Sequence, residues 1–125
     1  MEKIRQVKDK GNGAFKSAYF QDAITFYEEA LMQTKFRKSD IAKEEPNLTA
    51  EEAVKVEVDK AELETIHQAL LNNLAMCYQK RKEYDESCFY NDCCLELNPE
   101  HVKARYRRAI LHAQDSKFDQ AKEVA

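Results

Sequence analysis

The sequence predicts an all-α fold built from repeated helix–turn–helix units, and three observations support this prediction. Glycine and proline number only two each among 125 residues, so few positions interrupt a helix. Apolar side chains recur at helical spacing in several segments. Small residues recur at matched intervals along the chain, as in repeat architectures. Together these features predict a helical solenoid of three repeats, with a long insert between the first and the second.

The composition argues for a folded domain with no nucleic-acid or membrane partner. Hydrophobic residues make up 43% of the chain and charged residues 34%, a balance typical of a globular or helical-repeat protein. The net charge of −3 gives no basic surplus for nucleic acid. No run of about 20 apolar residues is present, and the first residues lack the apolar core of a signal peptide. Four cysteines without a secretory signal are expected to be reduced thiols, which predicts a cytoplasmic protein.

The repeat is carried by small residues. They are Gly11, Ala23 and Ala30 in the first segment, Ala75, Ser87 and Cys94 in the second, and Ala109 and Ala121 in the third. The first two members lie twelve residues apart in every segment, and the third follows seven residues later in the two complete ones. Antiparallel helices pack closely where small side chains let the backbones approach. The spacing therefore predicts helix pairs with turns near residues 17–20, 80–83 and 115–117.

Repeat one is expected over residues 4–36 and the insert over residues 37–66. Repeat one carries an apolar helical stripe, which comprises Ile24, Tyr27, Ala30 and Leu31. In the insert, Thr49 followed three residues later by Glu52 predicts a capping box, and hence a long helix that runs into repeat two. The alternation of valines at positions 54, 56 and 58 leaves a strand as the alternative.

Repeat two is expected over residues 67–99 and repeat three over residues 101–125. Leu70, Leu74 and Cys77 have helical spacing, and Pro99 ends the second repeat because proline cannot continue a helix. The third repeat stops inside its second helix, and no capping helix follows. Since a solenoid needs a polar cap over its last apolar face, we expect the chain to be a piece of a longer protein.

These segments resemble tetratricopeptide repeats, which are helix–turn–helix units of about 34 residues. The resemblance covers residues 4–32 and 68–125. It is carried most clearly by the run Leu-Ala-Met-Cys-Tyr at 74–78, by Tyr84 and by Leu-Asn-Pro at 97–99. The insert between repeats one and two is similar to those of immunophilin-type and related co-chaperone repeat domains. The resemblance thus implies a single repeat domain over residues 1–125.

Polar and basic side chains recur at matched places on the three predicted first helices. Lys8 and Asn12 lie four residues apart and so share one helix face, as do Lys103 and Arg107. Asn73 and Arg107 each precede the small residue of their helix by two positions. In a stack of helix pairs the first helices line the concave side. We therefore expect these five side chains to meet in one groove, although Asn72 could take the place of Asn73.

This set resembles the dicarboxylate clamp of co-chaperone tetratricopeptide domains. The family's motifs appear here as Lys-Asp-Lys-Gly-Asn at 8–12, Asn-Asn-Leu-Ala at 72–75 and Lys-Ala-Arg-Tyr-Arg-Arg-Ala at 103–109. The resemblance implies a co-chaperone or adaptor that binds the C-terminal Glu-Glu-Val-Asp tail of heat shock protein 90 or 70. Lysine, arginine and asparagine side chains are suitable donors for the two carboxylates of a C-terminal aspartate.

Other interpretations of the chain stay open or are disfavoured. Phe15 and Met76 would form an apolar pocket for the peptide or pack between helices. The cysteines lack zinc-site spacing, and Cys77 with His112 has no orienting partner, so we expect no metal, no cofactor, no small-molecule substrate and no enzyme in this chain. The rival functions are an import-receptor or scaffold domain that binds internal peptides, and a regulatory arm of a larger prolyl isomerase or phosphatase.

Overall fold

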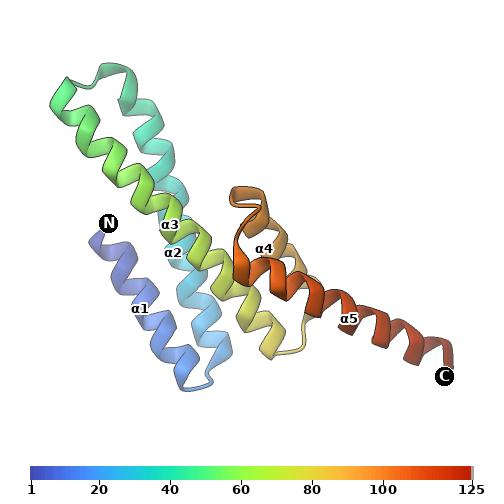
Figure 1. The fold of residues 1–125 in the computed structure, drawn as a ribbon. Coiled ribbons are helices and arrows are strands. Elements are labelled where there is room, and N and C mark those ends of the chain that lie inside the picture. The colour runs from blue at the N-terminus through green and yellow to red at the C-terminus, as the bar shows by residue number, and fades with distance from the viewer. Residues whose placement is uncertain (125) are drawn as a thin grey trace. The chain divides into compact units, whose positions relative to one another are not determined.

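The computed structural model of the chain describes the backbone of residues 1–124 and the side chains of residues 1–114. Five α-helices follow one another in these residues, with a single 3-10 turn between the second and the third (Figure 1). They are α1 (Glu2–Lys16), α2 (Phe20–Glu44), η1 (Glu45–Asn47), α3 (Ala50–Lys80), α4 (Tyr84–Leu97) and α5 (Val102–Val124). No strand occurs within residues 1–124. The predicted all-α helical-repeat fold is confirmed.

The chain divides into two compact units, Met1–Leu70 and Leu71–Ala125. The first unit contains α1, α2 and the beginning of α3, and the second contains the end of α3 with α4 and α5. The helix α3 is therefore shared by both units. Among the described helices, none combines the length and the apolar character that a bilayer-spanning segment requires.

In unit one, α1 packs along α2 at small residues of both helices. Gly11 is buried, and Ala23 and Ala30 are fully buried. The ring of Tyr27 lies so close to Gly11 that a Cβ there would be 2.6 Å from its Cε1 atom. The connecting turn contains Ala18 in the left-handed region, at φ 64°. The predicted first crossing, with its turn near residues 17–20, is confirmed.

The insert lengthens two helices. The last part of α2 and the first part of α3 form a hairpin that is closed by η1 (Figure 1). Along the hairpin, Ile41, Val56 and Leu63 are buried, whereas the valines at 54 and 58 are exposed. In a strand, the valines at 54, 56 and 58 would lie on one face and would be buried or exposed together. Only the middle one is buried, as in a helix, so the strand alternative is wrong.

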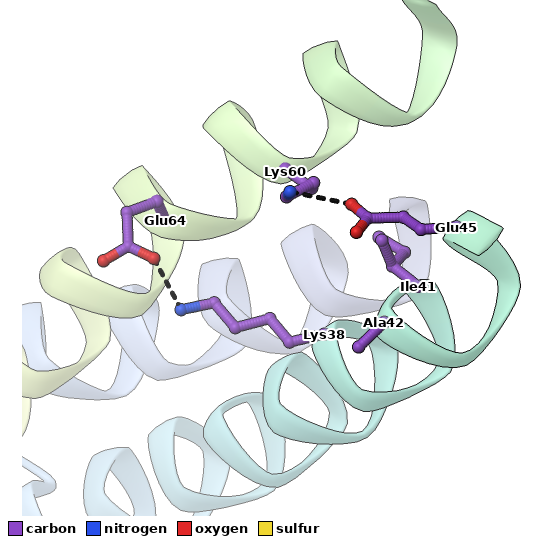
Figure 2. A pocket seen from close by; sticks show the side chains of 6 residues that line it. All are labelled: Lys38, Ile41, Ala42, Glu45, Lys60 and Glu64. Atoms are coloured by element: carbon purple, nitrogen blue, oxygen red, sulfur yellow. Dashed lines mark hydrogen bonds and ion pairs between the residues drawn. The ribbon is translucent and has the colours of Figure 1, made fainter. Parts of the chain in front are cut away.

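Polar contacts support the hairpin. Lys38 on α2 pairs with Glu64 on α3, and Lys60 on α3 pairs with Glu45, each at 2.7 Å (Figure 2). The two pairs flank a cavity of about 210 Å³. The backbone N–H of Glu52 donates to the Thr49 hydroxyl at 3.3 Å, as the capping motif predicts. The long helix that runs from Thr49 into repeat two is confirmed.

Unit two repeats the same type of crossing. Ser87 and Cys94 on α4 are fully buried, as is Ala75 on α3. The Ser87 hydroxyl donates to the carbonyl oxygen of Ala75 at 2.7 Å, which joins the two helices where they approach. The turn between them contains Lys82 at φ 62°, again in the left-handed region. The predicted second crossing, with its turn near residues 80–83, is confirmed.

The predicted third turn, near residues 115–117, is absent. The backbone of α5 is one helix from Val102 to Val124, and Ala109 is exposed. Each of the two formed turns places a non-glycine residue at positive φ, which costs about 1–2 kcal/mol unless helix packing offsets it. Continuing the helix avoids that cost, which is why the small-residue spacing was wrong here.

Candidate functional site

Two of the predicted site residues, Lys8 and Asn12, lie on α1 in unit one. The hydroxyl of Tyr27 donates to the Asn12 Oδ1 atom at 2.6 Å. Because Tyr27 is only 1% exposed, this bond fixes the amide and leaves its NH₂ group to donate elsewhere. Lys8 is half-buried and has no ion pair with a described residue. The α1 surface therefore presents an oriented amide donor and an ammonium group.

Three hydrogen bonds fix the side chain of Arg107 in unit two. It is only 7% exposed. Its Nη1 atom donates to the Oδ1 atoms of Asn72 at 2.6 Å and Asn91 at 3.3 Å, and its Nε atom donates to Gln79 Oε1 at 3.2 Å. The Nδ2 atom of Asn91 in turn donates to the carbonyl oxygen of Ala104 at 2.9 Å. The guanidinium is thus fixed by α3, α4 and α5 together.

The acceptors that surround Arg107 are all neutral amides. Within the described side chains, no carboxylate pairs with this guanidinium. Burial is the main cause that lowers its pKa, yet a guanidinium stays protonated in proteins. Buried charges are normally paired with an opposite charge. Arg107 therefore leaves a net positive charge in a desolvated place, which favours an anion beside it.

The other two predicted residues of unit two are more accessible. Asn73 is half-buried on α3, and its side chain makes no hydrogen bond with the described residues. Lys103 is exposed on α5, one helical turn before Arg107. The pKa of nearby His101 is lowered, first by burial and then by the charges of Arg107 and Lys103. The positive potential at the start of α5 is thus felt by a neighbouring side chain.

The five predicted residues divide between the units. Lys8 and Asn12 share a face of α1. In unit two, Lys103 and Arg107 share a face of α5, and Asn73 follows directly after the asparagine that holds the guanidinium. Asn72, the alternative groove residue, is 6% exposed and is bound to Arg107.

Two members of the guanidinium network were missed from the sequence. Gln79 lies in the last turn of α3 and Asn91 in the middle of α4. Asn91 gives a signal that could have found it, because it lies four residues after Ser87 and three before Cys94. An asparagine on the packed face of a helix needs hydrogen-bond partners.

Each unit contains one of the two residues proposed for an apolar peptide pocket. In unit one, the ring of Phe15 contacts that of Phe20 edge to face, with centroids 5.4 Å apart and planes at 64°. This contact favours ordinary packing as the role of Phe15. Met76 is half-buried on α3 in unit two.

The four cysteines form no disulfide bond, and the two with a raised pKa have little nucleophilic character. Burial raises the pKa of Cys77 to about 11, and burial is also the main cause that raises the pKa of Cys94. The thiolate is the nucleophile, so Cys77 is inert at neutral pH. His112, its suggested partner, is exposed. In the region with described side chains, no group of three or more His, Cys, Asp or Glu residues could hold a metal ion.

Comparisons with known proteins find similarity along nearly the whole chain. The chain is 29% identical over 122 residues to the aryl-hydrocarbon-interacting protein-like 1 of Mus musculus, covering 98% of this chain and 34% of that protein. It is 30% identical over 125 residues to the mitochondrial import receptor subunit TOM70 of Rattus norvegicus, covering 98% of this chain and 16% of that protein. The human TOM70 is 29% identical over the same length.

The chain therefore spans about a third of the length of the first relative and about a sixth of the second. No protein-family model matches the chain, and no solved structure matches it. Both relatives contain tetratricopeptide repeats. The all-α fold of helical hairpins and this similarity fit a tetratricopeptide repeat domain.

Proposed function

We propose that this chain is a non-catalytic protein-interaction module of the cytoplasm, which binds the acidic C-terminal end of a partner. The ligand that we infer is the Glu-Glu-Val-Asp tail of heat shock protein 90 or 70. The module would act as a co-chaperone or adaptor that couples this chaperone to another part of its own protein, without a cofactor or metal. Lys8, Asn12, Asn73, Lys103 and Arg107 are the residues to which we assign carboxylate binding.

The observation that carries the proposal is the buried guanidinium of Arg107. Its three hydrogen bonds to described residues all go to amide oxygens, so its charge is not neutralised by them. Two of its five N–H groups, those on Nη2, are left for a ligand. A hydrogen bond from such a group to a carboxylate contributes about 1.5–3 kcal/mol. Lys103, an exposed residue one turn earlier on the same face of α5, would add a second positive charge.

The geometry of Asn12 supports the same proposal from unit one. Its carbonyl oxygen is already occupied by the Tyr27 hydroxyl, so the group that it offers outward is a donor. A donor next to the ammonium of Lys8 suits the main-chain carboxylate of a C-terminal residue. Four or five such bonds, after the cost of association, correspond to about micromolar affinity. Because the interaction is ionic and partly exposed, salt should weaken it.

The test is a titration with two forms of one peptide that ends in Glu-Glu-Val-Asp, one with a free C-terminal carboxylate and one with an amide. We expect the amide form to bind at least about tenfold more weakly, which equals ~1.4 kcal/mol. Lys8→Ala and Lys103→Ala should weaken the acid form by a similar factor, since both remove a cation without disturbing a core. Lys10→Ala, an exposed lysine on the same helix as Lys8, is the matched control.

Equal affinity for the acid and amide forms would contradict the proposal. It would favour a receptor for internal peptides, a function that the similarity to an import receptor subunit makes the main competitor. Circular dichroism of each variant serves to separate lost binding from lost folding.

A further inference from the structure

A second surface of unit two carries negative charge and aromatic rings, in contrast to the positive charge at Arg107. Three aromatic side chains and two carboxylates line a pocket of about 310 Å³, and they are Tyr78, Asp85, Glu86, Phe89 and Tyr90. One of them comes from the end of α3, and the other four come from the first half of α4. The pocket is thus a feature of one unit and involves none of the five clamp residues.

The aromatic rings of this pocket form an ordered group. The rings of Tyr78 and Tyr90 are stacked, with centroids 5.6 Å apart and planes at 8°. Phe89 meets Tyr90 edge to face, at 5.3 Å and 79°. Phe89 is nevertheless 63% exposed, so much of its ring faces water. A fixed group of rings with an exposed member offers a π-surface to a ligand.

The two carboxylates lie beside this surface. Asp85 precedes Phe89 by four residues, and Glu86 precedes Tyr90 by four, so each acid neighbours a ring on the same helix face. Both acids are exposed, and neither forms an ion pair with a residue whose side chain is described. Aromatic faces attract cations through their quadrupole, and nearby carboxylates strengthen this attraction.

The acids also lie in the first turn of α4, where the helix dipole favours negative charge. That preference accounts for Asp85 and Glu86 but not for three aromatic rings beside them. Phe89 is 63% exposed, so its ring adds little to the core, and it lies beside a stacked pair of tyrosines and not alone on the surface. The combination of rings and acids is therefore better explained by a cationic ligand.

We propose that this pocket binds an arginine side chain of a partner polypeptide. A guanidinium is planar, so it can stack on the ring of Phe89 while its N–H groups donate to Glu86 or Asp85. An ammonium group would satisfy the charge but not the stacking. The chain would then have two contact surfaces of opposite preference, an anion-binding one around Arg107 and a cation-binding one around Phe89. The second does not depend on the proposed function of the first.

The test uses N-acetyl-arginine amide as the probe and N-acetyl-citrulline amide as its neutral counterpart of the same shape. Amide chemical shifts of the labelled chain are followed by nuclear magnetic resonance during each titration. We expect arginine to shift residues of the pocket, with citrulline binding at least about fivefold more weakly because it lacks the charge. Phe89→Ala and Glu86→Gln should each reduce arginine binding by a similar factor. Glu96→Gln, an exposed acid farther along α4, is the control.

Phe89 and Glu86 are not in the core, so both variants should retain the helical content of the parent chain. Equal binding of citrulline and arginine would overturn the proposal, because the charge would then play no part. An equal effect of Glu96→Gln and Glu86→Gln would overturn it as well, since attraction would be general to the acidic surface. Shifts confined to residues outside the pocket would have the same consequence.

Discussion

Gly11 and Gly13 form a matched pair that tests how closely α1 approaches α2. A Cβ atom at position 11 would lie 2.6 Å from Cε1 and 2.7 Å from Cδ1 of Tyr27, whereas a Cβ atom at position 13 would meet nothing within 4 Å. Both glycines lie inside the same helix. Replacing either by alanine gains about 1 kcal/mol of helix propensity. The difference between Gly11→Ala and Gly13→Ala therefore isolates the effect of packing.

The magnitude follows from the surroundings of Tyr27. Its ring is 1% exposed, so overpacking against it should cost about 2 kcal/mol. Displacing the ring also breaks the hydrogen bond from its hydroxyl to Asn12, which costs about 1 kcal/mol. After the gain in propensity, Gly11→Ala should lower the free energy of unfolding by about 2 kcal/mol. Gly13→Ala should raise it by about 1 kcal/mol.

Urea denaturation followed by far-ultraviolet circular dichroism measures both changes on the same chain. Tyr27→Phe supplies a third variant, which removes the hydrogen bond to Asn12 and leaves the ring in place. It should account for about 1 kcal/mol of the loss in Gly11→Ala. If Gly11→Ala and Gly13→Ala were equally stable, the argument that a glycine is needed for this helix crossing would be refuted.

Three further predictions concern other sites, each measured by urea denaturation. Burial is the main cause that lowers the pKa of His67 from 6.5 to about 4, and the charge of Lys38 is the second. The imidazole therefore binds a proton more tightly in the unfolded chain than in the folded one. The contribution of His67 to the free energy of unfolding should be constant above pH 6.5. It should fall by about 1–2 kcal/mol as the pH drops to 4, after allowance for solvent screening. The variant His67→Gln should not show this loss. Arg107→Met should cost about 2 kcal/mol because three amide oxygens lose their donor, whereas the exposed neighbour change Arg108→Met should cost less than about 0.5 kcal/mol. Thr49→Ala should cost about 1 kcal/mol through loss of its cap, and an unchanged midpoint would contradict that role.

The two helix crossings could be predicted because they depend on local features of the sequence. Small residues such as Gly11 and Ser87 report where two backbones touch, whatever the surrounding fold. The sequence of the insert is compatible with two structures, because valines at alternate positions occur both in strands and on the flank of a helix. The capping motif at Thr49 favours the helix. Burial of Val56 between two exposed valines shows that the segment is helical.

The third turn and the guanidinium network could not be predicted in the same way. A turn with a left-handed residue forms only if two helices gain enough contact to offset its cost, and spacing alone does not report that gain. The offset of Arg107 from Ala109 marks it as a candidate in the sequence, but its hydrogen-bond partners depend on how α3, α4 and α5 pack. Gln79 and Asn91 come from two different helices, and only the packed structure brings them to one side chain.

The insert lengthens both α2 and α3, and this restricts how the number of residues in this region can change. In a helical hairpin, removing residues from one arm alone rotates every later side chain about 100° per residue away from its partner. Only whole turns, removed from both arms together, keep Lys38 opposite Glu64 and leave Ile41 and Leu63 on the buried faces of their helices. Insertions and deletions in this region should therefore add or remove one turn in each arm at once, which is about seven residues in total.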